Sequence, residues 1–118
     1  MLVCLICSHM EAQTRLVGPH QGTLKAAGKY MIELFGCSDH MEIYVFTKDL
    51  QATSNVGITG EVQFFDGKNT VVAQLVLYGR DGFAAKLPTT EFDSCSVGIS
   101  MPDGRITAEF PSECPINY

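Results

Sequence analysis

The sequence predicts an all-β fold, namely an immunoglobulin-like β-sandwich of seven to eight antiparallel strands. Between Leu16 and Phe110, apolar and polar residues alternate through short segments, which is the pattern of strands with one buried face. Gly, Asp, Asn and Pro residues separate these segments about every 8 to 12 residues, a spacing typical of sandwiches. The chain contains no Trp, so it lacks the buried tryptophan of antibody-type domains. A small closed barrel is the alternative arrangement.

Seven segments carry the alternation, and each is expected to form a strand. They cover residues 29–35, 41–47, 58–65, 70–78, 83–87, 92–101 and 106–110. Hairpin turns are expected at residues 66–69, 79–82 and 102–104, because these contain the Asp and Gly residues that tight turns favour. Along residues 70–78 the side chains expected to point inward are Val71, Ala73, Leu75 and Leu77. The central core is expected to include Ile32, Val62, Leu75, Val97 and Phe110.

Length and composition limit the organisation of the chain and exclude some classes of function. The chain has 118 residues, of which 46% are hydrophobic and 18% are charged, and this suits one small folded domain. The formal net charge is −5 and the Lys and Arg residues are scattered singly, so a nucleic-acid-binding face is not expected. No apolar run reaches the roughly 18 residues that a transmembrane helix needs.

Residues 1–12 are interpreted as part of a signal peptide, and residues 13–118 as a single β-sandwich domain. The first seven residues are apolar, and the small residue Ala12 precedes a polar stretch, as at a signal cleavage site. A basic n-region is missing, and the alternative is a short edge strand or helix of the mature fold. The interpretation predicts a periplasmic or secreted protein, and it removes Cys4 and Cys7 from the mature chain.

A resemblance to a known family rests on two blocks, Gly-Pro-His-Gln-Gly at residues 18–22 and Gly-Lys-Tyr-Met-Ile-Glu at residues 28–33. They are similar to the Gly-Pro-His-Gly-Gly and Gly-x-Tyr-His-x-Glu opening of small periplasmic domains, some of them joined to heavy-metal efflux adaptor (membrane fusion) proteins. The resemblance covers residues 18–110, and only these opening blocks are distinctive. It implies a periplasmic sandwich tied to metal handling, with envelope efflux proteins as partners. Gln21 and Met31 replace a Gly and a His of the family pattern, and a thioether still suits a soft ion such as Cu(I).

His20 is the first candidate metal ligand. It follows Pro19 in a Gly-rich loop, where an exposed imidazole can face a ligand. The alternative is that His20 only bonds a nearby carbonyl or carboxylate and orders the turn.

A second group of donors lies at the expected turn between residues 35 and 41. Cys37, His40 and Met41 offer a thiolate, an imidazole and a thioether, which suit copper or zinc. Met31 lies about 20 Å of extended strand from Cys37, so a single site is not expected to use both ends of that strand. The alternative is an ordinary turn formed around Asp39.

Three cysteines remain once the leader is removed, and an exported protein can form a disulfide. Cys95 alternates in phase with apolar residues, so it is expected in the core. We favour a Cys37–Cys114 bridge, but other pairings stay open because a sequence does not determine connectivity. Such a bridge would abolish the soft-metal turn, since Cys37 would no longer supply a thiolate.

The sequence contains no group of residues arranged for catalysis. Its carboxylates are scattered, and it has neither a Gly-rich phosphate loop nor a nucleophile on a strained turn. We therefore expect a non-enzymatic, exported accessory or binding module in envelope heavy-metal handling, with copper as the expected ion. The alternative is a structural or protein–protein interaction sandwich without a bound metal.

Overall fold

The fold is all-β, as the sequence predicts. The structure is a computed structural model that describes residues 16–89 and 91–111, and this part of the chain contains strands and no helix. The strands are β1 (Leu16–Val17), β2 (Thr23–Ala27), β3 (Tyr30–Gly36), β4 (His40–Thr47), β5 (Thr59–Phe65), β6 (Thr70–Gln74), β7 (Val76–Tyr78), β8 (Gly82–Lys86), β9 (Ser94–Met101) and β10 (Gly104–Pro111). The expected leader at residues 1–12 and Cys114 lie outside the described residues.

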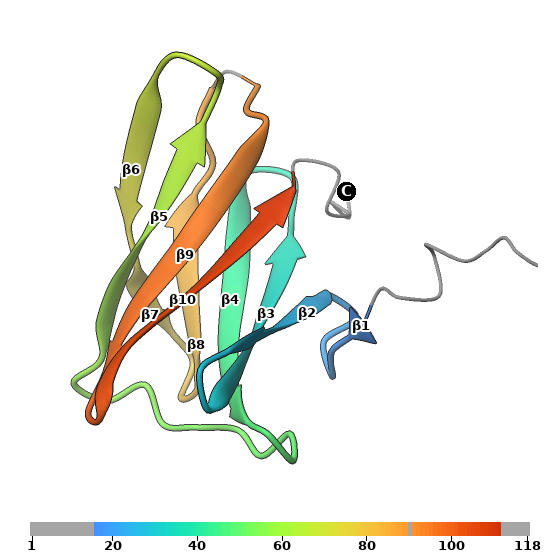
Figure 1. Ribbon diagram of the computed structural model, residues 1–118, viewed down its shortest axis with the longest axis vertical. Coiled ribbons are helices and arrows are strands. Elements are labelled where there is room, and N and C mark those ends of the chain that lie inside the picture. Colours follow the sequence, from blue (N-terminus) through green and yellow to red (C-terminus); the bar gives the residue numbers. More distant parts are fainter. Residues whose placement is uncertain (1–15, 90, 112–118) are drawn as a thin grey trace, which may run out of the picture.

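The strands form two antiparallel sheets that lie one in front of the other (Figure 1). Sheet A has the strand order β1-β2-β3-β4-β8-β7, and sheet B has the order β10-β9-β5-β6. The described residues thus form ten strands and not the seven to eight that the sequence predicts. Two of the additional strands, β1 and β2, are not among the predicted strands, since β1 has only two residues and β2 has five, whose burial does not alternate.

The core lies between the two sheets and is built by the alternation along each strand. In sheet A, Ile32 of β3 pairs with Val45 of β4, and in sheet B, Val62 of β5 pairs with Val97 of β9. All four side chains are at most 1% exposed. The other buried members of this core are Ala27, Leu34, Met41, Ile43, Phe64, Phe83, Ala85, Cys95, Ile99, Met101, Ile106, Ala108 and Phe110. The expected central residues therefore lie in the core, with Leu75 only partly buried against it.

The three hairpin turns that the sequence predicts are confirmed, and they join β5 to β6, β7 to β8 and β9 to β10. At the first of these turns, the carboxylate of Asp66 accepts hydrogen bonds from the backbone N–H groups of Lys68 and Asn69. Gly67 has a φ of 95°, a conformation that residues with a side chain rarely adopt. Asp and Gly therefore both have a specific role in this turn.

Residues 70–78 do not form the single strand that the sequence predicts. β6 belongs to sheet B and β7 to sheet A, and the chain crosses between the sheets at Leu75, whose backbone N–H donates to the carbonyl of Gly60. Val71 and Leu77 lie opposite the core residues Phe64 and Phe83 and share their face, as predicted, but they are 45% and 56% exposed because β6 and β7 are edge strands. Period-two alternation indicates which residues share a face of one sheet, but it carries no signal for a change of sheet.

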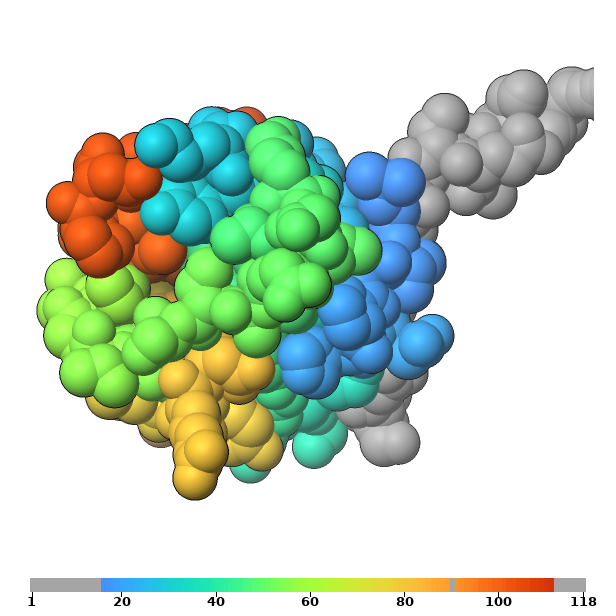
Figure 2. All heavy atoms as spheres, turned by 90° about the horizontal axis from the view of Figure 1, so that it is seen from below, coloured from blue at the N-terminus to red at the C-terminus, as the bar shows by residue number. Residues whose placement is uncertain are grey.

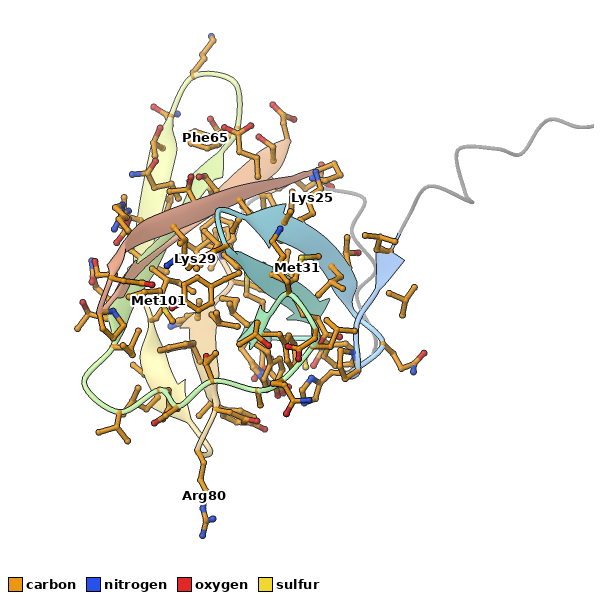
Figure 3. All side chains as sticks on the ribbon, turned by 60° about the horizontal axis from the view of Figure 1, so that its bottom comes forward. Lys25, Lys29, Met31, Phe65, Arg80 and Met101 are labelled. Atoms are coloured by element: carbon orange, nitrogen blue, oxygen red, sulfur yellow. The ribbon has the colours of Figure 1, made fainter. Side chains whose placement is uncertain are left out.

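The connection between β4 and β5, residues 48–58, covers one end of the sandwich (Figure 2). Asn55 is 2% exposed, and its side-chain amide donates to the carbonyl oxygens of Gly79 at 3.1 Å and Gly82 at 2.7 Å. These two carbonyls flank the β7–β8 turn, from which Arg80 points away from the molecule (Figure 3). Asn55 therefore fixes a long connection to a distant hairpin.

We predict that Ile32→Ala lowers the free energy of unfolding by about 2–5 kcal/mol, because it leaves a cavity between the two sheets. Val72→Ala is the control, since Val72 is 51% exposed on β6, and it should change stability by less than about 1 kcal/mol. Urea unfolding followed by circular dichroism measures both variants. Equal losses in the two variants would contradict the placement of Ile32 in the core.

Candidate metal centre

The β3–β4 hairpin brings candidate metal donors to the outer face of sheet A. β3 ends at Gly36 and β4 begins at His40, and the backbone N–H of Cys37 donates to the carbonyl of His40 at 2.8 Å to close the turn. Successive side chains of a strand point to opposite faces. His40 and Glu42 therefore share the outer face, while Met41 between them packs in the core.

The donor atoms of Cys37, His40 and Glu42 lie within 4.8 Å of one another. Cys37 Sγ is 3.6 Å and His40 Nε2 is 3.3 Å from the same carboxylate oxygen, Oε2 of Glu42. With ordinary zinc bond lengths, two ligands of a tetrahedral ion lie about 3.6 Å apart for sulfur and oxygen and about 3.4 Å apart for nitrogen and oxygen. Two of the three distances between donors therefore match those of a tetrahedral zinc ion, and the third, between Cys37 and His40, is within 4.8 Å.

Three neighbouring side chains, those of Asp39, Tyr44 and Tyr78, hydrogen-bond these donors. Asp39 Oδ1 is 2.8 Å from Nδ1 of His40, and the other ring nitrogen of His40 lies toward Glu42. The hydroxyl of Tyr44 donates to Oε1 of Glu42 at 2.7 Å, which leaves Oε2 for the other two donors. Outer hydrogen bonds of this kind fix the orientation and the tautomer of metal ligands in proteins.

The charges of the cluster perturb its titration. Burial alone would raise the pKa of Glu42, but hydrogen bonds from its neighbours outweigh burial and hold that pKa below its ordinary value. The hydrogen bond with Asp39 raises the pKa of His40. Burial, and then the negative charge of Glu42, raise the pKa of the Cys37 thiol. A metal ion would therefore displace a proton from Cys37, because the thiolate is the form that binds metals.

The two candidate methionines lie apart from this cluster. Met41 is 4% exposed and packs between the sheets, on the face of β4 opposite to His40. Met31, labelled in Figure 3, is on β3 opposite Phe46, four residues along β4 from Glu42. Strand geometry thus directs the thioether of Met41 into the core. It places the thioether of Met31 more than one side-chain length from Glu42.

Glu42 is absent from the donors expected from the sequence, although a signal for it is present. Residues i and i+2 of a strand face the same side, so His40 at the start of β4 has Glu42 and not Met41 beside it. Alternation along residues 41–47 is visible in the sequence, and extending it back to His40 would have identified Glu42 as the third donor.

His20 belongs to a different arrangement, in the loop between β1 and β2. Its Nδ1 is 2.9 Å from Oε1 of Glu33, and its backbone N–H donates to Oε2 of the same carboxylate at 2.8 Å. The backbone N–H of Gly22 also donates to this Oε2 at 2.8 Å. Glu33 is fully buried, and these bonds satisfy a carboxylate that would otherwise be costly to bury. In this geometry the ring of His20 orders the loop around Glu33.

The loop closes around Glu33 because two of its residues are glycine. A Cβ at Gly18 would collide with the Glu33 carboxylate, and a Cβ at Gly22 would collide with the carbonyl of Leu34. Between them, Gln21 adopts a φ of 71°, which turns the chain back toward β2. The two sequence blocks at residues 18–22 and 28–33 therefore meet around one buried carboxylate.

Tyr44 connects this loop to the metal-donor cluster. The ring of His20 stacks on the ring of Tyr44, with the centroids 3.6 Å apart and 9° between the planes, and the hydroxyl of Tyr44 bonds Glu42. Burial, and then this hydrogen bond, raise the pKa of Tyr44, so its hydroxyl remains a donor at neutral pH. The loop thus packs on the side chain that orients a candidate metal ligand.

The cysteines have different surroundings. Cys95 is 1% exposed and lies in the core, as the alternation of β9 predicts. Cys37 is half-buried and forms no disulfide with any residue that the structure describes. Cys114 lies outside the described residues, so the Cys37–Cys114 bridge stays a prediction.

We predict that Glu33→Gln lowers the free energy of unfolding by about 2 kcal/mol or more, because an amide cannot accept all three hydrogen bonds and leaves a buried N–H unsatisfied. Glu109→Gln, at an exposed position on β10, is the matched control and should change stability by less than about 0.5 kcal/mol. Urea unfolding measures both, and an unchanged midpoint for Glu33→Gln would contradict the role of Glu33 in holding the loop.

No helix in the described part of the chain has the length and apolar character needed to cross a membrane. Comparison of the chain with protein-family models, with curated proteins and with solved structures finds no match.

Proposed function

We propose that the protein is an exported, non-enzymatic binding module in which Cys37, His40 and Glu42 hold a divalent metal ion. The main support is the placement of a thiol sulfur and an imidazole nitrogen at 3.6 and 3.3 Å from one carboxylate oxygen. Exposed carboxylates often cluster without binding an ion, but this group combines three kinds of donor on one short hairpin. Its imidazole and carboxylate are also held in place by outer hydrogen bonds, as in metal sites.

The donor set favours Zn(II) over copper, the ion expected from the sequence. Zn(II) accepts sulfur, imidazole nitrogen and carboxylate oxygen together, whereas Cu(I) prefers thiolate and thioether ligands. The thioether of Met41, which would favour copper, faces the core. Three protein ligands leave one position of a tetrahedral zinc ion for water or for a group on a second molecule. Such an open site suits the capture and transfer of an ion.

The immunoglobulin-like class of the sandwich, the export of the chain and a role in envelope heavy-metal handling belong to the same proposal. Support comes from the resemblance of residues 18–22 and 28–33 to periplasmic domains joined to efflux adaptors. An open zinc site on a small module fits the delivery of an ion to such a partner.

We predict that the full-length chain carrying Cys4→Ser and Cys7→Ser binds Zn(II) with micromolar or tighter affinity. His40→Ala in this background should weaken the binding about tenfold or more, because one of three ligands is lost. Ser38→Ala is the matched control, since Ser38 lies in the same turn and is not one of the three proposed ligands. Competition with a chromophoric chelator measures the three dissociation constants. Absence of zinc binding by the chain that carries only Cys4→Ser and Cys7→Ser would contradict the proposal.

His20→Ala distinguishes this site from one centred on the Gly-rich loop. The variant should keep more of the zinc affinity than His40→Ala, because His20 bonds Glu33 and acts on the cluster only through Tyr44. A larger loss in His20→Ala than in His40→Ala would make His20 the principal ligand and contradict the proposed donor set.

We predict that Tyr44→Phe weakens Zn(II) binding about tenfold with little effect on stability. The phenyl ring can still stack on His20, but the hydrogen bond from the Tyr44 hydroxyl to Oε1 of Glu42 is lost. Tyr30→Phe is the control. It removes the hydrogen bond between Tyr30 and Asp103, which lies outside the metal-donor cluster, and it should bind zinc as the wild type does. Equal affinities in the two variants would show that Tyr44 does not orient the ligand.

A further inference from the structure

The side of the sandwich formed by β6 and β7 is an unprotected strand edge (Figure 1). β6 is the last strand of sheet B and β7 is the last strand of sheet A, and residues 70–78 carry no charged side chain. The exposed large apolar side chains of this edge are Val71, Val72, Val76, Leu77 and Tyr78. Proteins usually protect sheet edges with charges, proline or bulges, because a free edge can pair with another strand.

A groove of about 410 Å³ opens between the sheets where the chain leaves β6. Its walls are Val71, Val72, Ala73 and Gln74 on one side and Lys86, Leu87, Pro88 and Thr89 on the other. β7 pairs with β8 only as far as Ala84. In the described part of the chain, therefore, no strand pairs with residues 85 and 86 on the side away from β4. Both walls of the groove offer a free strand edge.

The charge in this groove indicates what could occupy it. Lys86 is the one charged residue among those that line the groove, and it forms no ion pair with any described residue. An ammonium group beside an apolar groove favours a ligand that carries a carboxylate. The same edge of a second copy would bring none, since residues 70–78 contain no acidic residue.

We propose that this groove binds an extended segment of a partner protein, which adds a strand beside residues 85 and 86 and places a carboxylate against Lys86. Backbone hydrogen bonds to the free edge would give affinity, and the apolar walls and Lys86 would select a segment with alternating apolar residues and an Asp or Glu. None of the three metal donors lines the groove, but Lys86 lies directly opposite His40 on β4, so peptide binding is measured with no added metal.

Selection from a random decapeptide display library on the immobilised full-length chain tests this proposal. The enriched peptides should alternate apolar residues and carry Asp or Glu. Lys86→Glu should weaken the binding of such a peptide at least tenfold and should select Lys- or Arg-containing peptides instead. Lys68→Glu, a matched charge reversal at the β5–β6 turn outside the groove, should leave binding and selection unchanged.

Three results would overturn the proposal. The first is the absence of any enriched peptide, and the second is equal binding of acidic peptides by the wild type and Lys86→Glu. The third is that the wild type sediments as a dimer and Val72→Lys as a monomer. The edge would then be the interface with a second copy of the chain and not the binding site of a partner segment. Val72 is 51% exposed, so this variant should fold, and circular dichroism verifies that it does.

Discussion

The alternation of side chains along β4 is the constraint on which both the core and the candidate metal centre depend. Met41, Ile43 and Val45 face the second sheet, and each is at most 4% exposed. The intervening positions put His40 and Glu42 on the outer face, where the turn supplies Cys37. A register slip of one residue would exchange the two faces, so the packing that stabilises the sandwich also holds the donors together.

The outer face of sheet A differs from the solvated polar face that alternation normally predicts. Glu33 is completely buried there beneath the loop at residues 18–22, and Tyr44 is 6% exposed beneath His20. The loop at residues 18–22 therefore has two physical effects. It supplies hydrogen-bond donors to the buried carboxylate of Glu33, and its His20 ring stacks on Tyr44, which hydrogen-bonds Glu42. A change in this loop would be transmitted to the metal donors through one aromatic ring.

The parts of the molecule that the sequence predicts are those that depend on near neighbours in the chain. Alternation identifies the core strands, and Asp-Gly identifies the β5–β6 turn. The burial of Glu33 cannot be predicted in this way, because its partners lie 11 and 13 residues away and two of the three hydrogen bonds come from backbone N–H groups. The change of sheet at Leu75 is equally hidden, since the apolar pattern continues through it. Glu42 is an intermediate case, visible from alternation but not from a search for soft donors alone.

The coordination of zinc by Cys37, His40 and Glu42 is tested most directly by X-ray absorption at the zinc edge, with one equivalent of Zn(II) bound to the full-length chain carrying Cys4→Ser and Cys7→Ser. We predict one sulfur at about 2.3 Å together with nitrogen and oxygen ligands at about 2.0–2.2 Å, and loss of the sulfur in Cys37→Ser. A shell of nitrogen and oxygen alone in the chain that keeps Cys37, or one with two or more sulfurs, would contradict this coordination.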